Sequence, residues 1–260
     1  MRAAGCVFAE EEAALLIGAA SGPSLEALVG RRVAGEPLEH LLGWASFHGL
    51  RVTVTPGVFV PRRRTELLVD LAVSILGRRN HHSGPADDDF GVQLSAPRVV
   101  DLCCGSGAVG AAVQHEVPEA EVWAADVDPV AVACARRNLP TQRVVEGDLY
   151  AALPATLRNA VDVVVVNAPY VPTDAIADMP PEARDHEPRV ALDGGDDGVG
   201  LHRRVADGVR DWLRPGGRLL VETSRRQATL TVAACEAAGL EASVETDDDR
   251  DATAVVAVAP

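Results

Sequence analysis

The sequence predicts an α/β protein built on a mostly parallel, seven-stranded sheet with helices on both faces. Three observations carry this prediction. From residue 98 onward, short apolar runs alternate with segments of helical periodicity, which is the order typical of a parallel sheet. Some runs, such as residues 163–166 (VVVV), are apolar on both faces, which indicates strands that are covered on both sides. A glycine-rich turn joins the first of these strands to a helix.

A short helical segment, a hairpin and a longer helix are expected before this sheet. Residues 10–34 read as two short helices, and residues 50–60 alternate around Pro56-Gly57, which suggests a β-hairpin. Thr65 is a plausible cap for a helix over residues 66–76. Residues 77–97 are rich in Gly, Pro, Asp and His and predict a loop. Its two histidines, His81 and His82, stand near three aspartates, Asp87 to Asp89; metal binding is conceivable, but a solvated loop is favoured.

The sheet itself is expected from residue 98 to the end of the chain. Its seven strands are predicted over residues 98–104, 121–127, 143–148, 161–167, 216–223, 241–246 and 251–259. The intervening helices are predicted over residues 107–117, 129–139, 200–213 and 227–239, with Pro129 in a first helical turn. The chain then divides into an N-terminal helical region (1–45), a hairpin, helix and loop linker (46–97) and the sheet domain (98–260).

Composition limits the partners. The 260 residues carry a net charge of -14, and every basic residue is an arginine. Because attraction to phosphates supplies most nucleic-acid affinity, this charge argues against a nucleic-acid partner. The five cysteines are odd in number and form no C-x-x-C, so neither a disulfide framework nor a zinc site is indicated. With no secretion signal and no apolar run of ~20 residues, we expect a cytoplasmic protein without a membrane segment.

Acidic residues and glycines recur where the first three strands of this domain end. The first strand contains Asp101 and leads into Gly105–Gly110, which matches G-x-G-x-x-G, a weak signal by itself. Asp126 ends the second strand, where a carboxylate can accept from ribose hydroxyls. Asp148 ends the third and could accept from an exocyclic amino group. A single such Asp is often only a turn residue or a cap, but three in register predict a nucleoside site.

Four motifs in this order resemble those of class I S-adenosylmethionine-dependent methyltransferases: DLCCGSGAVG, AADVDP, GDLY and NAPY. The closer resemblance is to the HemK/PrmC family of protein-(glutamine-N5) methyltransferases. It is carried by the N-terminal EEAALL and by residues 35–70, 181–205 and 213–222. The resemblance implies a Rossmann-like class I methyltransferase fold, S-adenosylmethionine as cofactor with S-adenosylhomocysteine as product, and no metal. It also implies a protein substrate that carries a target glutamine, such as a release factor or another translation protein, and a monomer is favoured.

The resemblance also implies roles for particular residues. The Asn167 side-chain oxygen and the Ala168 carbonyl would accept the two N–H groups of the target amide, which orients its nitrogen for transfer. The catalytic set is Asn167, Ala168, Pro169 and Tyr170. The cofactor-binding set is Asp101, Cys103, Cys104, Gly105, Ser106, Gly107, Asp126, Val127, Asp148, Leu149 and Asn167. The substrate-binding set is Pro61, Arg62, Thr65 and Glu66.

The chain departs from the family pattern on the substrate side. It reads NAPY where the family has N-P-P-Y, and Pro61-Arg62-Arg63-Arg64-Thr65-Glu66 where the family has P-R-P-E-T-E. The N-terminal helical region, which docks the protein substrate in the release-factor enzymes, is shorter. A paralogue acting on another protein is therefore one interpretation. An adenine-N6 methyltransferase, a small-molecule N-methyltransferase and a non-catalytic S-adenosylmethionine-binding protein are the alternatives.

Overall fold

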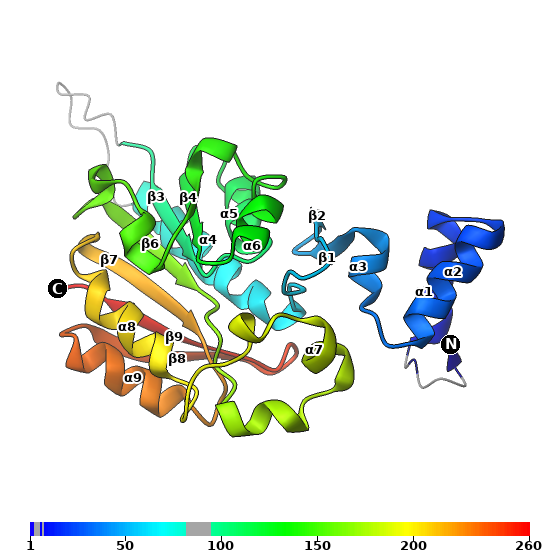
Figure 1. Ribbon diagram of the computed structural model, residues 1–260. Helices are drawn as coiled ribbons and strands as arrows, with labels where there is room; N and C mark the ends of the chain where they lie inside the picture. The colour runs from blue at the N-terminus through cyan, green and yellow to red at the C-terminus, as the bar shows by residue number, and fades with distance from the viewer. Residues whose placement is uncertain (3–5, 7, 82–94) are drawn as a thin grey trace.

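A computed structural model describes residues 1–2, 6, 8–81 and 95–260, and its centre is a single seven-stranded sheet (Figure 1). The strand order is β5-β4-β3-β6-β7-β9-β8. Strand β9 runs antiparallel to β7 and β8, and the other neighbours are parallel, so the predicted fold class is confirmed. The strands are β3 Arg98–Leu102, β4 Glu121–Asp126, β5 Val144–Glu146, β6 Val161–Val166, β7 Leu213–Glu222, β8 Glu241–Asp247 and β9 Ala252–Val258.

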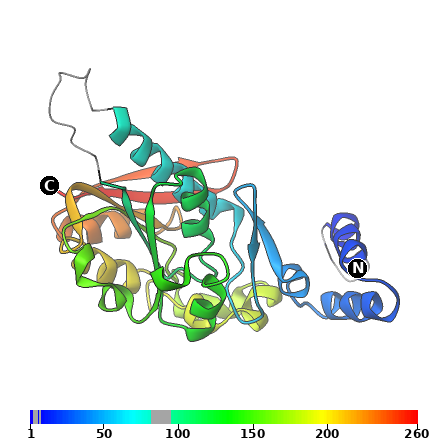
Figure 2. The same cartoon turned by 90° about the horizontal axis from the view of Figure 1, so that it is seen from above.

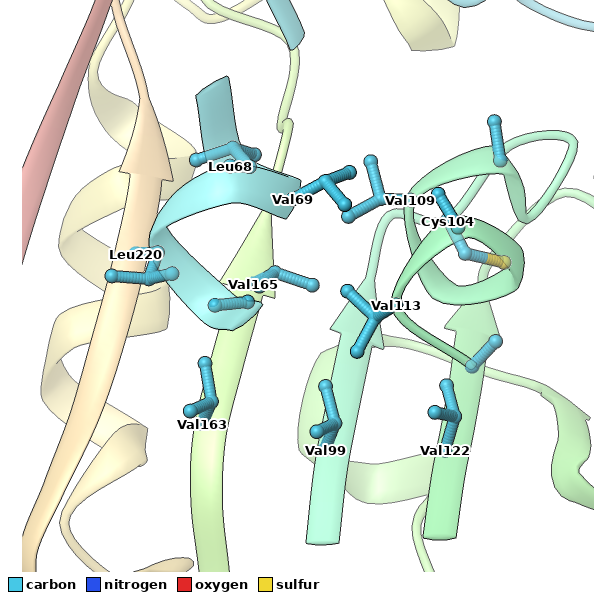
Figure 3. Close-up of a cluster of buried hydrophobic side chains, with 14 of the residues drawn as sticks. Leu68, Val69, Val99, Cys104, Val109, Val113, Val122, Val163, Val165 and Leu220 are labelled. Carbon is cyan, nitrogen blue, oxygen red and sulfur yellow. The ribbon is translucent and has the colours of Figure 1, made fainter. Parts of the chain in front are cut away.

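Helices cover both faces of the sheet because successive side chains along each strand point to opposite faces and are apolar on both. On β6, Val163 and Val165 belong to the core under α4 (Glu66–His81), α5 (Ala108–Glu116) and α6 (Pro129–Ala135). Figure 3 shows part of this core, with Val163 and Val165 on the strand between Leu220 of β7 and Val99 of β3. Val164 and Val166 belong to the opposite core, with α8 (Gly200–Val209) and α9 (Ala228–Ala237). This two-residue period explains why the VVVV run is apolar throughout.

The N-terminal helices stand away from the sheet (Figures 1 and 2). They are α1 (Ala9–Ala19) and α2 (Gly22–Val33), and α3 (Leu38–Leu42) connects them to the hairpin. Arg32 of α2 is nearly buried and ties this part together, because its guanidinium pairs with Glu12 of α1 and, at 3.4 Å, with Glu182.

The hairpin turns at a different place from the one expected. Strand β1 (Trp44–Phe47) pairs with β2 (Leu50–Thr53), and the turn is His48-Gly49. Both turn residues have positive φ, 47° and 74°, as a two-residue turn with the twist of the strands requires. The predicted hairpin around Pro56-Gly57 is therefore wrong; these two residues form a separate turn after β2, closed by Val58 N, which donates to the Thr55 carbonyl at 3.1 Å. The hairpin also begins before residue 46, the proposed start of the linker region.

Helix α4 also differs from the prediction, since it continues to His81 and not to residue 76. A 3₁₀ turn, Arg63–Thr65, precedes it. The possible metal ligands His82 and Asp87 to Asp89 lie outside the described residues. No helix in the described ranges is both long and apolar enough to cross a bilayer. The remaining short elements are α7 Pro181–His186 and 3₁₀ turns at Thr141–Arg143, Leu149–Ala152, Ala155–Leu157, Thr173–Asp178 and Arg189–Ala191.

Strand register brings the expected site residues to one edge of the sheet. Leu102, the last residue of β3, lies opposite Ala125 of β4 and Val166 of β6. Asp126 of β4 lies opposite Glu146 of β5. The turns that follow these four strands therefore start side by side, at the edge where parallel sheets bind ligands.

Candidate active site

A cleft of about 1160 Å³ opens at the carboxyl ends of β3, β4, β5 and β6. Its lining includes every residue of the three predicted sets except Gly107 and Glu66. A cleft for one small ligand is typically 300–1,000 Å³. This one therefore has room for a cofactor and for part of a second molecule.

The turn after β3 is held open by Asp126. Gly105 N donates to Asp126 Oδ2 at 2.8 Å, and Asp128 N donates to Asp126 Oδ1 at 2.9 Å. Gly105 has a φ of 55°, and a Cβ there would meet no atom within 4 Å, so its open side belongs to the cleft. Gly107 serves packing instead, because its Cβ would lie 3.1 Å from Ala135 Cβ in α6. This is why Gly107 does not line the cleft.

Asp101 lies beneath this turn and is 2% exposed. Its Oδ2 accepts from Gly110 N at 2.9 Å, which fixes the start of α5 against β3. Burial raises the pKa of Asp101 to about 7, and burial also raises the pKa of Asp126. Because both shifts come from desolvation of the charged form, a cation or hydrogen-bond donor bound in the cleft would stabilise the two carboxylates.

Asp148 is exposed at the mouth of the cleft, and Arg204 Nη2 contacts its Oδ2 at 2.6 Å. Arg204 also lines the cleft, and the sequence interpretation missed it. The next residue, Leu149, has a φ of 49°, which turns the chain into the cleft wall. On the other side, burial raises the pKa of the Cys103 thiol, so this side chain presents a neutral surface.

Asn167 and Tyr170 form a corner after β6. Asn167 Nδ2 donates to Thr65 Oγ1 at 3.3 Å, and Tyr170 OH donates to Glu222 Oε1 at 3.1 Å. Gln227 Nε2 donates to the Tyr170 carbonyl at 2.8 Å. Ala168 is buried in the core shared with Val166, yet it also borders the cleft. The side chains of this corner are thus fixed by residues from distant parts of the chain.

The arginine segment before α4 crosses this corner between two buried carboxylates. Arg62 pairs with Glu187, which also accepts from Val60 N at 3.2 Å. Arg64 Nε lies 3.3 Å from Glu222 Oε1. The Arg62 and Arg64 side chains are thus engaged by internal carboxylates and do not form a free basic patch.

Thr65 and Glu66 make contacts that the sequence interpretation did not include. Thr65 stands before α4, as a cap would, but its hydroxyl accepts from Asn167 Nδ2 and lies close to the Glu222 carboxylate. Glu66 accepts from His48 N at 2.8 Å and lies near Arg250, outside the cleft lining. A substrate contact by Glu66 stays a prediction.

The sequence interpretation also missed Glu187, Glu222 and Gln227. Glu222 ends the motif LRPGGRLLVE, and Glu187 lies in the 181–205 segment, so both were inside recognised stretches. A lone Glu or Gln carries no spacing pattern that would have singled it out. Only the tertiary contacts show that these side chains reach the corner.

The residues present fit S-adenosylmethionine. The open side of Gly105 leaves space for close approach of a ligand; Asp126 ends β4, and Asp148 follows the neighbouring strand β5. A buried carboxylate with a raised pKa suits hydroxyl donors, and the cleft carries negative side chains toward a cationic cofactor. Asp126 and Asp148 are the residues that would hold the nucleoside.

Comparisons with solved structures define the class. The 16S rRNA N2 G1207 methyltransferase of T. thermophilus, solved with AdoMet and guanosine, matches with a TM-score of 0.52 at 19% identity, over 84% of this chain and 50% of that chain. The hMettl16 catalytic domain, solved with a MAT2A 3′UTR hairpin, matches with a TM-score of 0.56 at 11% identity, over 82% and 76%. The sheet order and these neighbours show that the chain has the class I, Rossmann-like methyltransferase fold.

Sequence comparisons give the family. The model of the methyltransferase small domain matches residues 90–179. A release factor glutamine methyltransferase of Streptomyces coelicolor is 40% identical over 202 residues, which cover 77% of this chain and 67% of that protein. Those of Geobacter sulfurreducens and Bifidobacterium longum are 37% and 34% identical; the alignments cover 77% and 93% of this chain, and 65% and 83% of those proteins. The chain belongs to the release factor glutamine methyltransferase family.

Proposed function

We propose that the protein methylates the side-chain amide nitrogen, N5, of a glutamine in a protein substrate, and that this substrate is a release factor. The single observation that carries the proposal is the position of Asn167 beside the turn after β3, with its amide nitrogen tied to Thr65. Relatives that share 34–40% of their residues with the chain bear the name of this activity. A translation factor as substrate also implies a cytoplasmic site of action.

The chemistry requires an acceptor for each N–H of the target amide, because the amide lone pair is delocalised into its carbonyl. S-adenosylmethionine supplies an electrophilic methyl group on a sulfonium and leaves as S-adenosylhomocysteine. Asn167 Oδ1 and the Ala168 carbonyl would accept the two N–H groups and aim the nitrogen. As a positive charge develops on that nitrogen these hydrogen bonds strengthen, and the excess proton then leaves to solvent.

Tyr170 would pack against the planar amide and does not act as a base. Burial raises the pKa of its hydroxyl, and the nearby Glu222 carboxylate raises it further. The phenol therefore stays neutral at physiological pH and donates to Glu222. This is consistent with a reaction driven by orientation and not by deprotonation of the amide before attack.

Cofactor binding is tested by calorimetry, with an expected Kd on the order of 1 to 100 μM for S-adenosylmethionine. A thermal shift with NAD and none with S-adenosylmethionine would contradict the assignment of the cleft. The expected residues are Asp126 and Asp148 for the nucleoside and residues 103–107 for the methionine part.

The substrate is tested by methyl transfer from labelled S-adenosylmethionine, first to a purified bacterial release factor and then to a bacterial lysate. We expect protein-bound label that survives nuclease treatment, with the methyl group on a glutamine by mass spectrometry. Nuclease-sensitive label would favour the adenine-N6 alternative, and label in the small-molecule fraction would favour a biosynthetic enzyme. Cofactor binding without label in any fraction would indicate a non-catalytic protein.

A further inference from the structure

Glu222 joins three side chains of the corner after β6. Its side chain is 4% exposed at the end of β7. Oε1 accepts from Tyr170 OH at 3.1 Å and lies 3.3 Å from Arg64 Nε. The Thr65 hydroxyl lies close enough to the Glu222 carboxylate to act against the rise in its pKa that burial causes. Oε2 has no partner within the described residues, so the carboxylate is oriented entirely by the side that faces the corner.

The chemistry of the side chains determines which atoms donate and which accept between Glu222, Thr65 and Asn167. An ionised carboxylate can only accept, so the Thr65 hydroxyl must donate its hydrogen to Glu222. The lone pairs of Thr65 Oγ1 then remain to accept, and they meet Asn167 Nδ2 at 3.3 Å. With Nδ2 turned to Thr65, Oδ1 is the atom that Asn167 presents on its other side, and Asn167 lines the cleft. No hydrogen bond from another described residue reaches Oδ1.

We infer that Glu222 and Thr65 are positioning residues that hold the Asn167 carboxamide with its oxygen, and not its nitrogen, toward the target amide. A reversed carboxamide would present N–H donors to an N–H donor and would repel the substrate nitrogen. Glu222 fixes the opposite wall at the same time, because it also holds the Tyr170 hydroxyl. The inference rests on the proposed function, since it assigns a task to Asn167.

Arg64 favours the arrangement in which Thr65 donates to Glu222 and accepts from Asn167, which we call the relay. A neutral Glu222 could itself donate to Thr65, whose hydroxyl would then be free to donate to Asn167 Oδ1 and turn the carboxamide around. Burial raises the pKa of Glu222, and the guanidinium of Arg64, beside Oε1 and 5.9 Å from the centre of the Tyr170 ring, opposes that shift and favours the ionised carboxylate. Arg64 is a position where this chain departs from the family pattern, so this counterion belongs to this chain.

The first test uses a matched pair at Thr65. Thr65→Val keeps the side-chain shape and removes the hydroxyl, and Thr65→Ser keeps the hydroxyl. We expect the valine variant to lose about 10- to 100-fold in kcat, the effect of one or two misplaced hydrogen bonds. Its Kd for S-adenosylmethionine and its Tm should stay near those of the wild type, and the serine variant should stay within about threefold in kcat.

Thr253→Val is the control for replacing a buried threonine, since Thr253 is 5% exposed in β9 and lies outside the cleft lining. A merely structural role of Thr65 would lower Tm and raise KM without a separate loss of kcat. A Thr65→Val enzyme with wild-type kcat would overturn the inference.

The second test is a double-mutant cycle with Glu222→Gln, which keeps the shape but can donate a hydrogen bond to Thr65. We expect kcat to fall about tenfold, and the Thr65→Val/Glu222→Gln double variant to lose less than the product of the two single losses. Independent, multiplicative losses would overturn the relay. If Glu222→Gln does not fold, the Thr65 pair decides alone.

Asn167→Ala distinguishes a failure of the proposed function from a failure of the positioning role of Thr65 and Glu222. Turnover retained in Asn167→Ala would remove Asn167 from the reaction and with it the proposed mechanism. An inactive Asn167→Ala beside a fully active Thr65→Val would leave the proposed function intact and refute only the positioning role.

Discussion

The cofactor side and the substrate side of the cleft are constructed in opposite ways. On the cofactor side, carboxylates hold backbone N–H groups over short stretches of chain: Asp101 and Gly110 are 9 residues apart, and Asp126 and Gly105 are 21 apart. On the substrate side, side chains hold side chains over long stretches. Asn167 and Thr65 are 102 residues apart, and Arg62 and Glu187 are 125 apart.

This difference indicates that the substrate side of the cleft can change its contacts more readily than the cofactor side. Backbone contacts within the β3–α5–β4 unit depend on a few glycines and carboxylates, so they survive changes elsewhere in the chain. A corner made from distant side chains changes whenever one partner changes, which suits the part that must recognise a particular substrate. The departures at Arg64 and Ala168 fall on this second side.

The sharpest test of this separation is Asn167→Ala. We expect kcat to fall by roughly 10² to 10³, as when an aligned hydrogen-bonding group is removed from an active site. The Kd for S-adenosylmethionine, measured by calorimetry, should change by less than about threefold, because Gly105 and Asp126 do not depend on the corner. A parallel loss of cofactor binding would show that the two sides are one unit.

On the cofactor side, the buried Asp101 should carry a cost in stability when its carboxyl ionises. Because the folded-state pKa of Asp101 is about 7 and its ordinary value is 3.8, the folded protein binds an extra proton between these values. The free energy of unfolding should therefore fall as pH rises from about 4 to about 7, by up to a few kcal/mol. Asp101→Asn keeps an acceptor for Gly110 N, and urea unfolding at several pH values should show that this part of the slope is gone. An unchanged slope would place the titration elsewhere.

Asp126→Ala addresses the cofactor side in the way that Asn167→Ala addresses the corner. It removes an acceptor for a ribose and the partner of Gly105 N, and hydrogen bonds to a charged group are each worth about 1.5–3 kcal/mol. Calorimetry should show a Kd for S-adenosylmethionine about 100-fold higher. The comparison is Asp128→Ala: Asp128 also lines the cleft, but its carboxylate caps Val130 N, so this change should cost ~1 kcal/mol of stability and weaken cofactor binding less than Asp126→Ala does.

Alanine substitutions of two glycines, one on each side of the cleft, should have smaller and opposite effects: one on kcat and the other on cofactor binding. A Cβ at Gly198 would lie 2.4 Å from the Tyr170 carbonyl and 2.1 Å from Gln227 Nε2, so Gly198→Ala must displace the corner. We expect about a tenfold loss of kcat together with a lower Tm. Gly105→Ala should leave kcat at saturating cofactor nearly unchanged and raise the cofactor Kd about tenfold, because its methyl would enter open space in the cleft. The same pattern from both variants would contradict the division.

The smallest effect is expected from Ala168→Pro, which restores the family's N-P-P-Y. The carbonyl that the chemistry needs is present in both residues, and Pro169 already biases residue 168 toward an extended backbone. Steady-state kinetics should therefore stay within about threefold of the wild type. A tenfold loss would mean that the buried position of Ala168 has no room for the ring, and that the corner is adjusted to alanine.

The sequence was sufficient for the sheet and for most of the cleft, because alternating strands and helices and residues at strand ends follow local rules. It failed at the hairpin, where Pro56-Gly57 is the stronger turn signal and His48-Gly49 makes the turn. It did not show that Thr65 contacts Asn167 of the corner while its neighbour Glu66 contacts His48. The partners Glu187 and Glu222 could not be foreseen, because no local pattern tells which distant carboxylate meets which arginine.

The register of the central strands has a consequence for the range of substrates. Leu102 and Val166 end adjacent strands at the same level, and adjacent strands are about 4.8 Å apart. The sheet thus fixes the distance between the turn that would hold the methyl donor and the corner that would hold its acceptor. Substitutions in the loops around residues 57–65 and 171–193 can change which substrate is recognised and leave that distance unchanged, because main-chain hydrogen bonds of the sheet define it.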